Sequence, residues 1–327
     1  GLALGIMQPK ILTTLRGYSR DLFIADVLAG VTVAMVALPL SLAIAIASGA
    51  EPGKGLITAI VGGFLISLFG GSRVQIGGPT GAFIVVVFGV IQSHGYDGLV
   101  VATMLAGVIL MAAGYFRLGS LVRYVPEPVI NGFTIGIAVI IATSQLGDIL
   151  GLPANRIPAD FLDKFPALWA ASPHVDVVTL AIGVVTMVLI VVFRRAAPKY
   201  PGLLLAVAIT SALVAVMDMP VDTIASRFGA LPRGLPVPML PEISVAKILE
   251  LLPSALVIAF LAGVESLLSA SVADRMSGGH HRPNAEILAQ GIANLGSSLF
   301  GGMPATGAGS FSTALWRNRR ALRAWLV

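Results

Sequence analysis

Charged side chains are scarce in this sequence. Asp, Glu, Lys and Arg make up 11% of its 327 residues, whereas hydrophobic residues make up 56%. An ordinary soluble protein carries roughly 25% charged residues, because water must solvate its surface. So few charges cannot cover a water-exposed surface of this size, and we therefore expect lipid to surround most of the chain.

Cysteine is absent altogether, which excludes disulfide bonds, thiolate metal sites and cysteine nucleophiles. The sequence also lacks the GxxxxGK[S/T] phosphate-binding pattern, the HExxH zinc motif and the GxSxG nucleophile elbow. We therefore expect no enzyme activity, no cofactor and no metal centre. The net charge of +5 comes from residues at the ends of apolar runs, so we assign it to membrane topology rather than to nucleic-acid binding.

Long apolar runs predict an all-α polytopic membrane protein. A helix needs about 20 apolar residues to cross the bilayer core, and the runs amount to about ten membrane segments. Glu265 is the charged residue inside the run 251–273, and the run 287–316 exceeds one span. The other runs, which contain no charged residue, are Val27–Ala50, Gly55–Ser72, Val74–Tyr96, Leu99–Phe116, Val129–Gly147, Val177–Phe193 and Leu203–Met217.

The distribution of Lys and Arg predicts the orientation. Cytoplasmic segments carry an excess of these residues, and this holds when the N-terminus is placed inside. The cytoplasmic set is then Lys10, Arg16, Arg20, Arg117, Arg123, Arg194, Arg195, Lys199, Arg275, Arg282, Arg317, Arg319, Arg320 and Arg323.

Three short motifs occur twice in the same order, which indicates an internal repeat. The first two motifs are separated by 40 positions in one half (28 to 68) and by 38 in the other (261 to 299). An odd number of segments between the copies would invert the second copy in the membrane, as in many secondary transporters. The pairs are Leu28–Val31 with Leu261–Val264, Leu68–Gly71 with Leu299–Gly302, and Pro79–Ala82 with Pro304–Ala308.

The repeat divides the chain into four parts. Residues 1–25 are expected to form a cytoplasmic N-terminal segment, and residues 26–218 the first repeat with segments one to seven. Residues 219–249 are expected to form an extracytoplasmic loop, and residues 250–327 a partial second repeat with segments eight to ten.

The motif 77–82 interrupts an apolar run and predicts a half-helix. Two glycines and a proline disfavour continuous helix, so we expect an extended piece up to Gly78 and a short helix from about Pro79 to Gln92. Its N-terminus would offer unpaired N–H groups and a positive dipole end to an anion. Thr80 would cap the helix and offer a hydroxyl. The motif 301–306 predicts a second such site; the alternative is that these glycines only allow close helix packing.

Glu265 is the acid well inside a predicted span. Burying a carboxylate in a membrane is costly, so such residues usually face a cavity and have a function. We interpret Glu265 as a proton carrier or cation ligand; the alternative is a structural hydrogen bond that holds its helix. Pro39 is expected to break the first span and free backbone groups, which either line the cavity or only mark a kink.

These motifs resemble the SulP (sulfate permease) family of anion transporters, in particular its bacterial branch. The resemblance implies two intertwined, inverted seven-segment repeats, half-helices at segments three and ten, and a core domain that moves against a gate domain. The segments that carry it are Ala37–Ala43 with Ala47–Gly49, Leu68–Arg73, Gly77–Ala82, Pro128–Gly136 with Ser144–Leu146, Glu265–Ser269 and Gly301–Ala308.

The family's anion lies between the two half-helices, beside segments one and eight. Carried over to this chain, the resemblance implies Glu265 as the coupling residue. The implied substrate-binding residues are Pro39, Thr80, Gly81, Ala82, Phe83, Ala305, Thr306, Gly307 and Ala308.

The chain also departs from the family pattern. Leu40 and Ile44 stand where many members have Gln and Tyr, which implies a more apolar site and makes sulfate a less expected cargo. The family continues past residue 308 with four more segments and a STAS domain. We therefore expect this chain, with its atypical tail over residues 309–327, to be truncated.

The expected function is secondary active transport of a small anion (dicarboxylate, sulfate or bicarbonate) by elevator-type alternating access with proton symport. A sodium-coupled bicarbonate transporter is a variant. An anion channel and a nucleobase permease of the same fold are further alternatives. The expected partners are the anion, a coupling proton or sodium ion, the lipid bilayer and a second copy of the chain in a homodimer. The expected location is the bacterial inner (cytoplasmic) membrane, with a cytoplasmic N-terminus.

Overall fold

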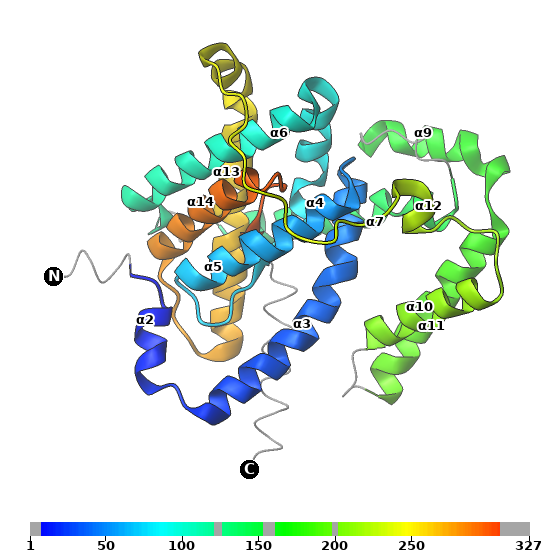
Figure 1. The fold of residues 1–327 in the computed structure, drawn as a ribbon, viewed down its shortest axis with the longest axis horizontal. Coiled ribbons are helices and arrows are strands. Elements are labelled where there is room, and N and C mark those ends of the chain that lie inside the picture. Colours follow the sequence, from blue (N-terminus) through cyan, green and yellow to red (C-terminus); the bar gives the residue numbers. More distant parts are fainter. Residues whose placement is uncertain (1–7, 121–125, 153–160, 198–201, 308–327) are drawn as a thin grey trace. The chain divides into compact units, whose positions relative to one another are not determined.

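The computed structural model describes residues 8–120, 126–152, 161–197 and 202–307, and these are mostly helical (Figure 1). The chain forms two compact units: Gly1–Ile135 with Pro232–Val327, and Gly136–Leu231. The first unit combines both ends of the sequence and contains all the motifs assigned to the anion site. The units do not test the division into repeats, which stays a prediction.

Helix α3 (Arg20–Ala47) follows two short turns, α2 (Ile11–Thr14) and η1 (Leu15–Gly17). Ser19 caps its N-terminus by accepting a hydrogen bond from the Leu22 amide at 3.3 Å. The helix continues through Pro39 to Ala47, so the expected break is wrong. A membrane helix tolerates an internal proline when its surroundings compensate for the lost backbone hydrogen bond.

The second span contains α4 (Pro52–Ile57), the π-helical turn η2 (Thr58–Gly62) and α5 (Gly63–Phe69). Two of its glycines allow close backbone approach. A Cβ at Gly55 would collide with the Ser41 carbonyl of α3, and a Cβ at Gly63 would lie 2.7 Å from the Gly77 carbonyl. A π-turn inside a helix is often found at a functional site, and this one lies beside the strand that follows α5.

The interrupted run contains strand β1 (Gly77–Gly78), the 3-10 turn η3 (Gly81–Phe83) and helix α6 (Ile84–Tyr115). Gly95 has φ 71° and ψ 178°, so α6 consists of two helices joined at a kink. The expected extended piece is therefore present. The half-helix begins at Gly81 rather than Pro79 and extends to the kink rather than to Gln92.

Helices α13 (Val245–Ser277) and α14 (Pro283–Leu299) lead to strand β2 (Thr306–Gly307). Helix α14 packs against α6 and α5, and α13 packs against α6 (Figure 1). A Cβ at Gly291 would lie 2.7 Å from the Gly107 carbonyl, so these glycines bring the backbones of α14 and α6 close together.

The main hydrophobic core lies among α6, α13 and the chain before β2. On the outer faces, Leu256 and Phe260 of α13 are exposed, as expected for side chains that contact lipid. Members of this core include Phe83, Val87, Leu99, Leu110, Leu251, Ile258, Leu267, Ile287 and Met303.

Helix α7 (Glu127–Ser144) leads into the second unit. That unit contains α8 (Leu146–Ile149), α9 (Phe161–Ala171), η6 (Ser172–His174), α10 (Val177–Ala196), α11 (Gly202–Val216) and α12 (Ile224–Phe228). Helix α10 packs against α11. At the start of α10, the Asp176 carboxylate accepts hydrogen bonds from the amides of Val178 and Thr179 at 3.1 and 3.3 Å.

Five helical stretches of the described residues are long and apolar enough to cross a membrane, and two further apolar helices are shorter. About ten segments were expected from the sequence. One reason for the difference is that the half-helix and the following run form a single stretch, Gly81–Tyr115. The other four are Arg20–Ala47, Pro52–Phe69, Val177–Ala196 and Val245–Arg275, and the shorter two are Ile135–Ile149 and Gly202–Val216.

Candidate functional site

The two copies of the glycine motif meet in an antiparallel pair of strands. Gly77 lies opposite Gly307, and Gly78 lies opposite Thr306. The strands come from different positions in the two motifs, because β1 precedes Pro79 whereas β2 follows Pro304. A Cβ at Gly77 would collide with Ile66, and a Cβ at Gly307 would collide with the Gln75 side-chain amide. A Cβ at either position would therefore require the neighbouring side chain or the strand to move, whereas neither glycine has a positive φ.

Thr80 lies between β1 and η3 with an extended backbone (φ −131°, ψ 159°). Its hydroxyl does not accept a hydrogen bond from the helix N-terminus, so its expected role as a cap is wrong. Instead it donates to Oε2 of Glu265 on α13 at 2.7 Å. Thr80 is only 6% exposed, and this contact joins the two residues that the sequence singled out in different halves of the chain.

Backbone N–H groups at the start of η3 remain available. The Phe83 amide donates to the Thr80 carbonyl at 3.3 Å. Within the described residues, the amides of Gly81 and Ala82 have no hydrogen-bond partner. Unpaired amides at the positive end of a helix dipole attract anions. The start of the half-helix therefore has the kind of donors that the predicted anion site needs, without Lys or Arg.

The structure also describes two other predicted site residues, Phe83 and Pro39. The Phe83 side chain is 1% exposed and belongs to the main core, so it packs the half-helix into place. Pro39 is half-buried on α3. Its neighbour Leu40 packs in one cluster with Ile76, the residue before β1, so this part of α3 lies against the approach to the strand pair.

The second half of the site is held by polar contacts to α13 and α14. Ala305 forms two hydrogen bonds with the side chain of Asn294. The Thr306 hydroxyl donates to the Ala262 carbonyl of α13 at 2.9 Å, and Thr306 is fully buried. Ala308 and the half-helix expected to follow it lie outside the described residues.

The chain before β2 is anchored by Thr58 in the π-turn η2. Its hydroxyl oxygen accepts a hydrogen bond from the Met303 amide at 2.7 Å, and Ser297 donates to the Met303 carbonyl at 2.7 Å. Tyr96, next to the kink in α6, donates to the Gly301 carbonyl at 2.9 Å. These contacts connect the first half of the chain to the second copy of the glycine motif.

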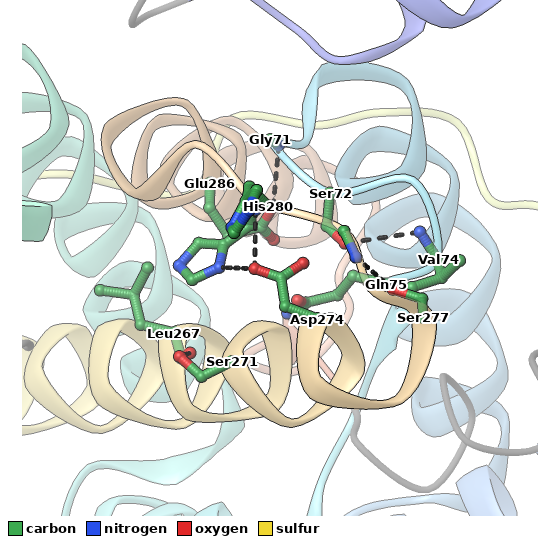
Figure 2. A network of polar contacts seen from close by, with 12 residues as sticks. Gly71, Ser72, Val74, Gln75, Leu267, Ser271, Asp274, Ser277, His280 and Glu286 are labelled. Atoms are coloured by element: carbon green, nitrogen blue, oxygen red, sulfur yellow. Dashed lines mark hydrogen bonds and ion pairs between the residues drawn. The ribbon is translucent and has the colours of Figure 1, made fainter.

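Glu286 is the functional candidate that the sequence reasoning missed. It is fully buried on α14. Its Oε2 accepts from the Gly71 amide at 2.8 Å (Figure 2). Its Oε1 accepts from Ser266 at 3.2 Å and from Gln290 at 3.0 Å. A polar stripe at every fourth position, Glu286, Gln290 and Asn294, was the available signal, because such residues share one helix face.

The loops at the Gly71 end of the first unit are linked through main-chain carbonyls. The Lys10 side chain donates to the His280 carbonyl at 2.8 Å. Arg282 donates to the Gln8 carbonyl at 2.9 Å. Burial, followed by the nearby charges of Arg282 and Arg73, lowers the pKa of Lys10. Lys10, Arg73 and Arg282 therefore lie close together at this end of the unit.

Known proteins resemble this chain over most of its length. Residues 23–317 match the model of the Sulfate permease family. YvdB of Bacillus subtilis, whose name provisionally assigns it to sulfate transport, is 46% identical over 295 residues, which cover 90% of this chain and 56% of YvdB. The bicarbonate transporter BicA of Synechocystis sp. is 34% identical over 295 residues, which cover 86% of this chain and 51% of BicA. The chain thus spans about half the length of the curated relatives it matches.

Solved structures give the same result for the fold. The transmembrane domain of a cyanobacterial bicarbonate transporter BicA has a TM-score of 0.82 and 29% identity, covering 94% of this chain and 81% of that domain. Murine Slc26a9, an anion transporter in an inward-facing state, has a TM-score of 0.82 and 19% identity, covering 97% and 58% of the two chains. The expected fold class, a polytopic helical protein with inverted seven-segment repeats, is confirmed.

Proposed function

The chain belongs to the sulfate permease family, and we propose that it binds a small anion at the β1–β2 pair and moves it across the membrane by secondary active transport. The unpaired amides of Gly81 and Ala82 beside the Thr80–Glu265 hydrogen bond carry this proposal. Relatives named for sulfate and bicarbonate transport support the class of cargo.

The Thr80–Glu265 contact suggests how a proton could be coupled to the anion. In the structure, Thr80 donates its hydroxyl hydrogen to Glu265, so that hydrogen is not available to a ligand. A proton on Glu265 would reverse the bond, because the carboxyl group would then donate to the Thr80 oxygen. The Thr80 hydroxyl could turn to the anion, and a repulsive negative charge would be removed. Proton and anion would therefore bind with positive coupling.

Sodium coupling is a second candidate, and Ser269 favours it. This residue lies one helical turn after Glu265, is 7% exposed, and its hydroxyl has no hydrogen-bond partner among the described residues. Residues four apart share one helix face. A carboxylate and a hydroxyl are oxygen ligands that a hard cation prefers. In this sodium-coupled alternative the cargo is bicarbonate, the ion for which BicA is named.

The proposal extends to the whole transporter. It would work by elevator-type alternating access between a core and a gate domain, with repeats over residues 26–218 and 250–327. It would form a homodimer in the cytoplasmic membrane with its N-terminus inside. The Lys and Arg bias supports this orientation, and the family fold supports the mechanism.

Uptake into proteoliposomes tests the proposal. The full chain is reconstituted, and labelled sulfate, bicarbonate and fumarate are supplied with an inward proton gradient, an inward sodium gradient or neither. We expect saturable uptake driven by one of the gradients. The variant T80V should abolish it. The matched variant T103V should not, because the buried Thr103 hydroxyl bonds only to the Leu99 carbonyl of its own helix.

Three outcomes would contradict the proposal. Folded wild-type protein that takes up none of the anions would exclude transport by this chain. Unsaturable anion currents would indicate a channel instead. Saturable uptake that survives T80V unchanged would show that the cargo binds elsewhere.

A further inference from the structure

The Ser266 hydroxyl donates to a side chain on another helix. In a helix, a serine hydroxyl commonly donates to the carbonyl four residues earlier, which for Ser266 is that of Ala262. Instead, Ser266 donates to Oε1 of Glu286 at 3.2 Å. The Ala262 carbonyl accepts the Thr306 hydroxyl at 2.9 Å. The Ala262 carbonyl is already an acceptor within the α13 backbone, so the direction of the Ser266 hydroxyl decides whether a second hydroxyl competes with Thr306 for it.

We propose that Glu286 is a positioning residue for Thr306. By accepting the Ser266 hydroxyl, it keeps that hydroxyl away from the Ala262 carbonyl, and Thr306 stays fixed opposite Gly78 in the strand pair. Glu286 does not touch the cargo in this scheme. The inference rests on the proposed function, because Thr306 is taken as part of the anion site.

The hydrogen bonds of Ser266 and Glu286 also involve residues that precede the first strand. The Gln75 side-chain amide donates to Oγ and to the carbonyl of Ser266, both at 3.0 Å. Gln75 lies two residues before β1, and its side-chain amide lies against Gly307 of β2. Oε2 of Glu286 accepts from the Gly71 amide, four residues before Gln75. Glu286 thus connects α14 to the segment before β1 through Gly71, and to β2 through Ser266 and Gln75.

The variant E286Q tests this chemistry without leaving a cavity. A backbone N–H can only donate, so the Gly71 amide forces the new side-chain oxygen towards itself and the new NH2 group towards Ser266 and Gln290. Oε1 of Gln290 has no partner in the structure, so that side chain can flip and accept. Ser266 would then accept from the new amide, and its own hydrogen would turn to the Ala262 carbonyl. The protein should fold, with Thr306 displaced.

Anion affinity gives the first readout. We expect E286Q to weaken binding of the labelled cargo to the purified full chain about tenfold, equivalent to ~1.4 kcal/mol, with the unfolding midpoint little changed. S266A removes the competing hydroxyl, while the Gln75 side-chain amide can still donate to the backbone carbonyl of residue 266. In the S266A background, E286Q should therefore change affinity less than about twofold, so the double-mutant cycle should show coupling.

Hydrogen exchange gives a second readout that needs no cargo. Backbone amides of residues 303–307 should exchange faster in E286Q than in wild type, and the E286Q/S266A double variant should exchange like S266A alone. Unchanged affinity and exchange in folded E286Q would overturn the inference. Equal losses with and without Ser266 would overturn the route through its hydroxyl. A wild type that binds no anion would contradict the proposed function instead, and the exchange data would still decide the role of Glu286.

Discussion

The Asn294 side chain forms hydrogen bonds with both backbone polar groups of Ala305. Its side-chain oxygen accepts from the Ala305 amide at 2.9 Å, and its NH2 group donates to the Ala305 carbonyl at 2.8 Å. The side-chain amide therefore pairs with Ala305 as a neighbouring strand would. Since Ala305 immediately precedes β2, one buried side chain of α14 sets the position of the second strand.

We expect N294D to weaken both stability and anion binding. The carboxylate keeps the contact to the Ala305 amide but faces the Ala305 carbonyl with a second acceptor. Each buried group left unpaired costs about 1–3 kcal/mol. Thermal unfolding in detergent and a labelled-anion binding assay measure the two effects. N284A is the control, because Asn284 is buried on the same helix and its side-chain oxygen has no partner. Equal behaviour of the two variants would disprove a special role for Asn294.

We expect G307A to block uptake. An added Cβ would collide with the side-chain amide of Gln75, so either β2 or Gln75 must move. The second substitution Q75A should restore part of the uptake because it removes the obstacle. Proteoliposome uptake normalised to folded protein is the measurement. G30A serves as the control, since a Cβ there meets no atom within 4 Å. Failure of Q75A to rescue any uptake would argue against this steric cause.

We expect E265Q to uncouple transport from the proton gradient while exchange of anions across the membrane continues. The neutral amide can donate to the Thr80 oxygen permanently, as protonated Glu265 would, and this leaves the Thr80 hydroxyl free for the anion. Gradient-driven uptake and counterflow, measured on the same vesicles, separate the two activities. Gradient-driven uptake at the wild-type rate would show that Glu265 carries no coupling proton.

Asp176 should make the second unit less stable in acid. The Thr179 hydroxyl, followed by the Val178 amide, holds the pKa of Asp176 below its usual value. A carboxylate whose pKa is lowered by folding stabilises the protein above its unfolded pKa, and this stability is lost as pH falls through the folded pKa. The unfolding midpoint of D176A should therefore lie below that of wild type at neutral pH, and the difference should vanish in acid. A difference that does not change with pH would rule out this charge effect.

Local signals in the sequence predicted several residues of the candidate site. The interruption at Gly77–Gly78 was visible because glycine and proline act on the backbone where they stand. Glu265 was visible because a charge inside an apolar run is costly wherever the run packs. The role of Thr80 as a cap was predicted wrongly, because its hydroxyl had a partner on α13 that local rules do not include. Glu286 was missed because it lies at the start of a helix whose burial cannot be read from composition.

The sequence by itself determined that this is a multi-pass helical membrane protein with two copies of a glycine-rich interruption, since apolar runs and helix breakers act locally. Only the tertiary structure decided that Gly77 pairs with Gly307, that Thr80 bonds to Glu265, and that Glu286 holds the loop at Gly71. The two side-chain contacts join residues 185 and 215 positions apart. The hydrogen bonds exist because the packing of α6, α13 and α14 brings these groups together where lipid and protein exclude water, so most buried polar groups pair within the fold.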